Sequence, residues 1–229
     1  NPAPLNAQVQ YQRSWSDAVN VFPLLGGASE TSSVSAPVQI NVLRGRTIHN
    51  VRVTATHSRS TARTHFSGVL DAAGAAGIVG ASSDPFDWGL PSLSFAGLSG
   101  LRDLAPSRRT DTRFGTDYTL TRPLQRHTLR LGGGFRHDTS DGRTVSDARG
   151  AFVFTGLHTS GGAVVPRGSG LDFADFLLGM PQQASVGFGA GDVTLRGLGF
   201  NLFAQEHWRA GSNLTFNLGV RYEVQGTFT

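Results

Sequence analysis

A long stretch of alternating residues, 198–225, constrains the fold more than any other feature of the sequence. In its second half six apolar residues occupy every second position, with polar residues or glycine between them: Leu214, Phe216, Leu218, Val220, Tyr222 and Val224 against Thr215, Asn217, Gly219, Arg221, Glu223 and Gln225. The first half, 198–209, alternates in the same way, and the residues at 210–213 include the turn formers Gly, Ser and Asn. Alternation with a period of two is typical of a strand that has one apolar and one polar face. The stretch therefore predicts a long antiparallel hairpin.

The length of this hairpin narrows the fold further. Each arm has about 11 residues, which rise about 25 Å at a tilt near 45°, and this is close to the height of the apolar band on an outer-membrane barrel. The polar face contains Arg221 and Glu223, which a polar lumen accepts and a sandwich core does not. Alternation alone is also compatible with a surface hairpin of a soluble or secreted all-β binding module. In a barrel the apolar faces point outward to lipid, whereas in a sandwich they point inward to a second sheet.

Composition excludes several classes of protein. The chain has 229 residues, 20 basic residues that are all arginine, a formal net charge of +4 and no cysteine. The arginines are scattered singly apart from Arg108-Arg109, so we expect no nucleic-acid partner. No run of about 18 apolar residues occurs, so no transmembrane helix is predicted. The absence of cysteine rules out disulfides and thiolate metal sites.

The rest of the chain repeats the hairpin pattern and predicts an all-β antiparallel meander. We expect strands at about 4–15, 35–44, 48–60, 109–122, 127–138, 149–156, 183–192, 197–209 and 214–225. The short connections 45–47, 123–126 and 210–213 should lie at one end, and the loops 16–34 and 61–108 at the other. Residues 157–182 then become a long connection at the end of the short turns, with one short helix near 172–180 (DFADFLLGM). Whether 139–197 holds two strands or one long loop stays open.

Four aromatic residues on apolar faces, Tyr11, Trp15, Trp208 and Tyr222, fall near predicted strand ends. This placement favours an aromatic girdle at a bilayer interface over ordinary core packing. Arg13 lies on the same face as Tyr11 and Trp15 and is tolerable only near a membrane edge. We therefore expect lipid to contact these faces.

No catalytic constellation is present. The seven histidines show no metal-ligand spacing supported by acids, Gly132-Gly133-Gly134 does not precede a helix, and no nucleophile elbow or P-loop occurs. We predict that the protein is not an enzyme and holds no metal or cofactor. A loop as long as 61–108 is improbable unless it has a function. Its residues Asp84, Phe86, Asp87 and Trp88 are the candidates for contacting a substrate, whose identity the sequence does not reveal.

Four segments occur in an order and spacing that resemble one family: RHTLRLGGGFR (126–136), ARGAFVFTG (148–156), FADFLLGMPQQ (173–183) and LFAQEHWRAGSNLTFNLGVRYE (202–223). They look like the barrel of TonB-dependent outer-membrane transporters of the Oar-like group, whose members often carry a carboxypeptidase-regulatory-like domain. GIVGASSDPFDWGLPSLSF (77–95) resembles their long loop less specifically. The resemblance covers about 75–229 well and 1–74 loosely. One of two acids that members tend to have before the tryptophan is lost here, at Glu206-His207.

The resemblance implies that residues 1–229 form a single partial domain of a 22-stranded barrel in the bacterial outer membrane. The plug, the regulatory domain, the energy-coupling box and the closing strand are absent from these residues. The implied partners are outer-membrane lipid, a plug domain, the TonB energy-transducing system and an unknown substrate. The implied mechanism is that outer loops capture the ligand and that energy transmitted through TonB displaces the plug from the lumen.

Overall fold

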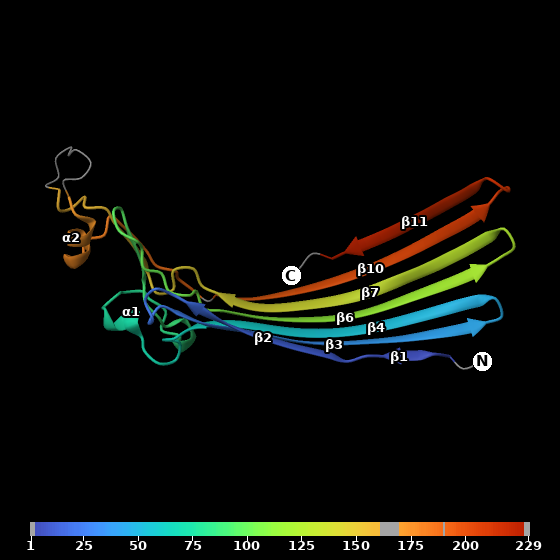
Figure 1. Ribbon diagram of the computed structural model, residues 1–229, viewed down its shortest axis with the longest axis horizontal. Helices are drawn as coiled ribbons and strands as arrows, with labels where there is room; N and C mark the ends of the chain where they lie inside the picture. The colour runs from blue at the N-terminus through green and yellow to red at the C-terminus, as the bar shows by residue number, and fades with distance from the viewer. Residues whose placement is uncertain (1–2, 161–169, 190, 227–229) are drawn as a thin grey trace.

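The chain forms one large curved antiparallel sheet with a smaller folded region at one end (Figure 1). The structure is a computed structural model and describes residues 3–160, 170–189 and 191–226. The strands of the large sheet are β1 (Leu5–Ala7), β2 (Gln10–Val19), β3 (Gly26–Arg44), β4 (Thr47–Thr64), β6 (Ser107–Pro123), β7 (His127–Thr144), β10 (Asp192–Arg209) and β11 (Thr215–Gln225). The smaller region contains β5 (Ser92–Phe95), β8 (Ala151–Phe154), β9 (Gln183–Ser185), α1 (Ala72–Ala75), the 3-10 turn η1 (Pro85–Asp87) and α2 (Asp172–Leu177). Among the described residues, no helix is long and apolar enough to cross a membrane.

The strands of the large sheet, with β1 and β2 sharing one edge position, follow one another in sequence order and pair antiparallel, which confirms the antiparallel meander. The order is β1-β3-β4-β6-β7-β10-β11, and β2 also pairs with β3. Since Leu5 pairs with Ile40 and Gln10 with Ser35, β1 and β2 behave as one interrupted edge strand. All three tight turns lie at one end, here called the turn end, and the long connections lie at the other, the loop end (Figure 1).

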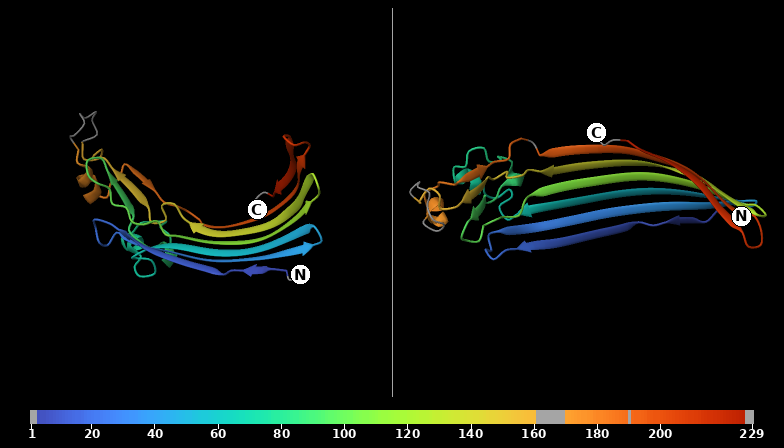
Figure 2. Two further views of the ribbon diagram at one scale, coloured as in Figure 1. Left: turned by 45° about the vertical axis from the view of Figure 1, so that its right-hand side comes forward. Right: turned by 90° about the horizontal axis from the view of Figure 1, so that it is seen from above.

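The polar face of the sheet is the concave one. Two views show the curvature of the sheet (Figure 2). A shallow cavity of about 270 Å³ on the polar face has a lining that reaches from Thr54 on β4 to Glu223 on β11, across five adjacent strands. One small cavity spans that many strands only where the sheet bends toward it. Arg221 and Glu223 form an ion pair on this face (3.2 Å).

The opposite, outward face is divided into two regions along the strands. Nearer the turn end is the apolar band: Ala36, Val38, Ile40, Val42, Val51, Val53, Ala55, Phe114, Tyr118, Leu120, Leu129, Leu131, Phe135, Leu198, Phe200, Leu202, Ala204, Phe216, Leu218, Val220, Tyr222 and Val224. Nearer the loop end is the polar extension: Glu30, Ser32, His57, Arg59, Thr61, Arg63, Arg108, Thr110, Thr112, Thr139, Asp141, Arg143, Asp192, Thr194 and Arg196. No second sheet packs on the apolar band in the part of the chain that the structure describes. The side chains of Leu202 and Val220 are 59% and 68% exposed.

The strands are longer than the alternation predicts, because they continue through the polar extension. β3, β4, β6, β7 and β10 have 17 to 19 residues each, against about 11 expected from the pattern. The prediction of a loop over 16–34 is wrong, since β2 runs to Val19 and β3 begins at Gly26. Ladder hydrogen bonds hold these segments although neither face is apolar there.

Two predicted wall strands, 149–156 and 183–192, are also wrong. β7 pairs directly with β10, from Arg143↔Asp192 to His127↔Trp208, so no strand fits between them. The chain after β7 therefore leaves and returns at the loop end, and 157–182 does not lie at the turn end as expected. The predicted helix is confirmed as α2, followed by Gly179 at φ 67°. β8 and β9 are short strands of a separate sheet, β5-β8-β9.

Three consecutive glycines in β7 let large side chains of β10 lie over the backbone. Gly132 pairs with Phe203 and Gly133 with Leu202, without interruption of the ladder. A Cβ on Gly132 would stand 2.6 Å from the backbone oxygen of Tyr118, and one on Gly133 would stand 2.6 Å from Leu202 Cδ2. The glycines therefore provide space on both faces rather than a bend.

Candidate functional site at the loop end

Three connections of the meander converge at the loop end and fold together: residues 20–25, residues 65–106 and the described parts of 145–191. Every buried residue other than glycine that the structure describes lies here or at the adjoining strand ends. The site is therefore the one place in the described chain with a closely packed interior.

A buried arginine on β7 connects the long loop to the wall. Arg143 Nη2 lies 2.7 Å from Asp87 Oδ2 and 2.8 Å from Asp84 Oδ2, and Nη1 lies 2.8 Å from Asp192 Oδ2. Asp87 is 2% exposed and also accepts a hydrogen bond from the Ser82 hydroxyl (2.7 Å). Since a buried charge is tolerated only when it is paired, these contacts fix η1 on the strands.

The two aromatic candidates are held by the same strand ends. The Phe86 ring contacts two guanidinium groups, with Arg63 at 5.6 Å and Arg108 at 5.5 Å from its centroid. The Trp88 backbone oxygen accepts a hydrogen bond from Thr64 Oγ1 (2.7 Å). Such cation–π contacts stabilise by about 0.5–2 kcal/mol depending on exposure. The structure thus brings Asp84, Phe86, Asp87 and Trp88 together, and the two carboxylates, the Phe86 ring and the Trp88 backbone oxygen anchor the loop.

A second buried pair joins the remaining connections. Asp103 accepts hydrogen bonds from the backbone amides of Gly26 (3.0 Å) and Leu104 (2.8 Å), and it lies 3.5 Å from Arg149 Nη1. Arg149 also donates to the Leu104 carbonyl oxygen (3.0 Å). Burial lowers the pKa of the Arg149 guanidinium, and the charge of Asp103 opposes that effect. The pair connects the first residue of β3, the segment before β6 and the residues before β8.

The carboxylate of Asp175 holds together the third connection, the described parts of residues 145–191. It is fully buried and accepts hydrogen bonds from the amides of Thr159 (2.9 Å) and His158 (3.2 Å). Burial favours the neutral form, but the hydrogen bonds from Thr159 and His158 outweigh it and lower the pKa of Asp175 below its ordinary value. The ionised carboxylate thereby fixes α2 against residues 158–159.

Between these anchors lies a cavity of about 660 Å³. Three rings pack beside it, with the Phe154–Phe176 centroids 5.4 Å apart and the Phe95–Phe154 centroids 5.6 Å apart. Its lining is apolar throughout: Phe22, Leu24, Leu25, Ala72, Ala76, Ile78, Leu90, Pro91, Leu93, Leu101, Phe152, Phe154, Phe176, Gly179 and Pro181. The volume is within the usual range of small-molecule sites. Without acids, bases or nucleophiles in its lining, the cavity offers binding to an apolar group rather than chemistry.

The comparison with known families agrees with this architecture. A family model described as an outer membrane beta barrel domain matches residues 5–229. The chain belongs to this family. No curated protein and no solved structure matches it. Membership places the barrel domain in the bacterial outer membrane.

Sequence reasoning missed the cavity of this barrel domain, because its lining comes from separate loop segments without any period. A signal was nevertheless present in aperiodic regions that are rich in large apolar residues, such as Phe22, Leu24 and Leu25. The girdle prediction is met unevenly. Trp208 lies one residue before the end of β10, stacked with His127 and near Phe216. Tyr222 pairs with Leu202 inside the apolar band, and Trp15 pairs with Glu30 in the polar extension.

Proposed function

We propose that this chain forms part of the barrel of a TonB-dependent transporter of the Oar-like group, which takes up an unidentified substrate by energy-coupled transport. The observation that carries the proposal is the apolar cavity of about 660 Å³ that the folded loops form at one end of a sheet with a polar concave face. A passive pore needs no such apolar site. The four sequence segments that resemble the group add independent support, because they occur in the same order.

The proposed partners follow from the same architecture. Lipid contacts the apolar band, a plug domain occupies the lumen, and the TonB system supplies energy through that plug. The loop end faces the outside, since bacterial barrels have short periplasmic turns and long outer loops. Cysteine labelling on intact cells should mark position 88 and leave position 124 unlabelled, and the reverse pattern would overturn this orientation.

In the proposed role, the loop-end cavity holds the apolar part of the substrate. The long loop that contributes to this cavity is positioned by Asp84, Phe86, Asp87 and Trp88. Direct contact of these four residues with substrate stays a prediction. The protein is not expected to alter the substrate chemically, because the cavity has no titratable residue in its lining.

The test is growth of cells that carry or lack the full-length gene, on a panel of media that each contain one limiting nutrient. Energy-coupled uptake is supported if cells without the gene grow poorly in one medium and if deleting TonB as well does not make that growth defect larger. It is refuted if growth is equal in all media, or if the defects caused by the two deletions add up in the double deletion.

Leu24→Trp should reduce uptake of that nutrient by filling the cavity. The matched control is Val21→Trp, since Val21 is 91% exposed and does not line the cavity.

A further inference from the structure

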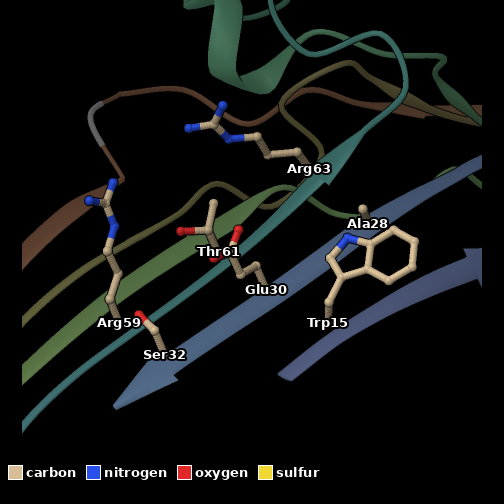
Figure 3. Close-up of a pocket in the computed structure, with 7 residues that line it drawn as sticks. All are labelled: Trp15, Ala28, Glu30, Ser32, Arg59, Thr61 and Arg63. Carbon is tan, nitrogen blue, oxygen red and sulfur yellow. The ribbon is translucent and has the colours of Figure 1, made fainter. Parts of the chain in front are cut away.

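A second, chemically different pocket lies on the outward face of the sheet at the loop end of β2, β3 and β4 (Figure 3). Its volume is about 410 Å³, and its lining consists of Trp15, Ala28, Glu30, Ser32, Arg59, Thr61 and Arg63. These residues belong to the wall and not to the apolar cavity described above. The pocket is therefore turned toward the membrane surroundings rather than toward the lumen.

Strand register gathers basic side chains in this pocket. Arg13 and Arg59 flank Ser32 in one row of the sheet, and Trp15 and Thr61 flank Glu30 in the next row. Arg63 lies two residues beyond Thr61 on the same face of β4, so Arg59, Thr61 and Arg63 point to the same side. Figure 3 shows the two long arginine side chains on either side of Thr61.

The charges of this pocket are only partly neutralised. Arg13 is paired with Glu30 (2.8 Å). Within the described residues, Arg59 and Arg63 form no ion pair, although Arg63 lies over the Phe86 ring. Asp17 shares a row with Arg63, with Ala28 between them, and forms no ion pair with it in the described chain. Two guanidinium groups are thus available to an anion from outside the protein.

The height of Arg59 matches the lipid headgroups. Ala55 is the last residue of the apolar band on β4, and Arg59 and Arg63 follow four and eight residues later. In a strand tilted near 45°, these two positions lie about 9 Å and about 19 Å beyond Ala55. The headgroup region adds about 5–8 Å to each side of the hydrocarbon core, and the flexible side chain of Arg59 covers the remaining distance. Arg63 lies above this level. A phosphate matches the fork of a guanidinium group and binds it through charge-assisted hydrogen bonds.

We propose that this pocket binds the phosphate-bearing headgroup of an anionic lipid in the outer leaflet, with Arg59 as the phosphate ligand and Arg63 as a second positive charge above it. Trp15 lies beside them, and its ring has the amphipathic character that membrane interfaces favour. Glu30 limits the affinity because it repels the phosphate and occupies Arg13. The proposal requires the outer-membrane location and the loop end facing outward, but it does not require that the barrel transports a substrate.

The test uses the full-length protein in detergent micelles, with diphosphorylated lipid A as the probe and native mass spectrometry to count bound lipid. Arg59→Ala should reduce the binding constant about 5–10-fold, since it removes one charge-assisted contact, and Arg59→Ala with Arg63→Ala should reduce it further. Arg59→Ala is the cleaner variant, because Arg63 also contacts Phe86. Glu30→Gln should increase binding. Arg52→Ala is the matched control, since Arg52 lies on the same strand but on the concave face.

Two further arms identify the source of the phosphate. Dephosphorylated lipid A should bind wild type no better than it binds the double variant, and inorganic phosphate should not displace the lipid at equal concentration. Equal binding of the phosphorylated and dephosphorylated probes would overturn the proposal. So would a loss in Arg52→Ala as large as that in Arg59→Ala, or full displacement by inorganic phosphate, which would indicate a site for the free anion.

Discussion

The apolar band and the loop end differ in which side chains are buried within the protein. In the band, large apolar side chains such as Leu202 and Val220 are exposed, and a continuous backbone ladder connects the strands beneath them. At the loop end, the interior contains charged groups, including Asp87, Arg143 and Asp175, which are buried and paired or hydrogen-bonded. The difference follows from the solvent on each side. In the proposed barrel, lipid completes the burial of the band, whereas the loop end stands in water and must pair its own buried polar groups.

The same difference explains why the strands extend beyond the apolar band. The strands do not end where the apolar band ends, but continue as a polar extension that carries the folded loops. The band should therefore be sensitive to charge and the loop end to loss of charge. Each of the following changes tests one side of that comparison.

The largest effect is expected when the buried ion cluster is broken. Arg143→Met leaves Asp87 buried without its partner, which should destabilise the loop end by about 3–5 kcal/mol. Limited proteolysis of the full-length protein in detergent should then cleave residues 65–106 faster. The heat-dependent gel mobility of the barrel should be retained. Arg109→Met is the control, since its exposed pair with Asp111 is worth about 0–1 kcal/mol. Equal protease resistance of wild type and Arg143→Met would show that the cluster does not hold the loop.

A charge introduced into the band should have the next largest effect. Val51→Arg, further inside the band, places a guanidinium group among lipid tails and should cost about 2–4 kcal/mol of folding free energy in a bilayer. Thr110→Arg, on the polar extension of the adjacent strand, should cost about 0–1 kcal/mol. Folding of the full-length barrel into lipid vesicles across a urea series measures both values. Similar costs for the two variants would remove the distinction between the band and the extension.

A smaller effect is expected from filling the space above the glycines of β7. Gly132→Ala puts a methyl group 2.6 Å from the Tyr118 backbone oxygen and against the Phe203 ring, at a cost of about 1–3 kcal/mol. Gly142→Ala, in the extension of the same strand, meets its nearest atom at 3.9 Å and should change stability by less than about 0.5 kcal/mol. The same urea series measures the stability of both variants. If Gly132→Ala is as stable as wild type, the neighbouring strands move to make room for the added methyl group.

The smallest effect concerns acid pH at the loop end. Because the folded-state pKa of Asp175 is lowered, its ionised form stabilises the fold. That contribution is present above the unfolded-state pKa of about 3.9 and is lost as pH falls through the folded value. Hydrogen exchange at the Thr159 amide, corrected for the intrinsic pH dependence of exchange, should therefore show protection that falls below about pH 4. Asp175→Asn should lack this dependence, and an identical pH profile in the variant would exclude Asp175 as its cause.

Sequence pattern predicted the band well and the extension poorly, for a physical reason. Alternation becomes visible only where one face meets an apolar environment, as at 214–225. In 26–34 and 57–64 both faces are polar, so these strand segments lack the signal although the ladder continues through them. The opposite error occurred at 149–156, where an apolar and aromatic run predicted a wall strand but belongs to the loop-end fold.

The candidate site was predictable only in outline. The sequence placed Asp84, Phe86, Asp87 and Trp88 in one loop, but their partners on the strands are far away in sequence. Asp87 and Arg143 are 56 positions apart, and Gly26 and Asp103 are 77 positions apart. No local pattern connects such pairs, because the register of the intervening strands brings them together. The cavity depends on these anchors and was therefore invisible before the fold was known.

The direct pairing of β7 with β10 has a consequence for how such a protein can diversify. The amide of Thr144 donates to the carbonyl of Gly191 (3.2 Å), so the chain leaves the wall and re-enters it at neighbouring points. The residues between Thr144 and Gly191 can therefore be exchanged for another loop while the hydrogen-bond ladder between β7 and β10 stays unchanged. New loops, and with them new ligands, can be inserted at this junction without any alteration of the strand register that holds the barrel together.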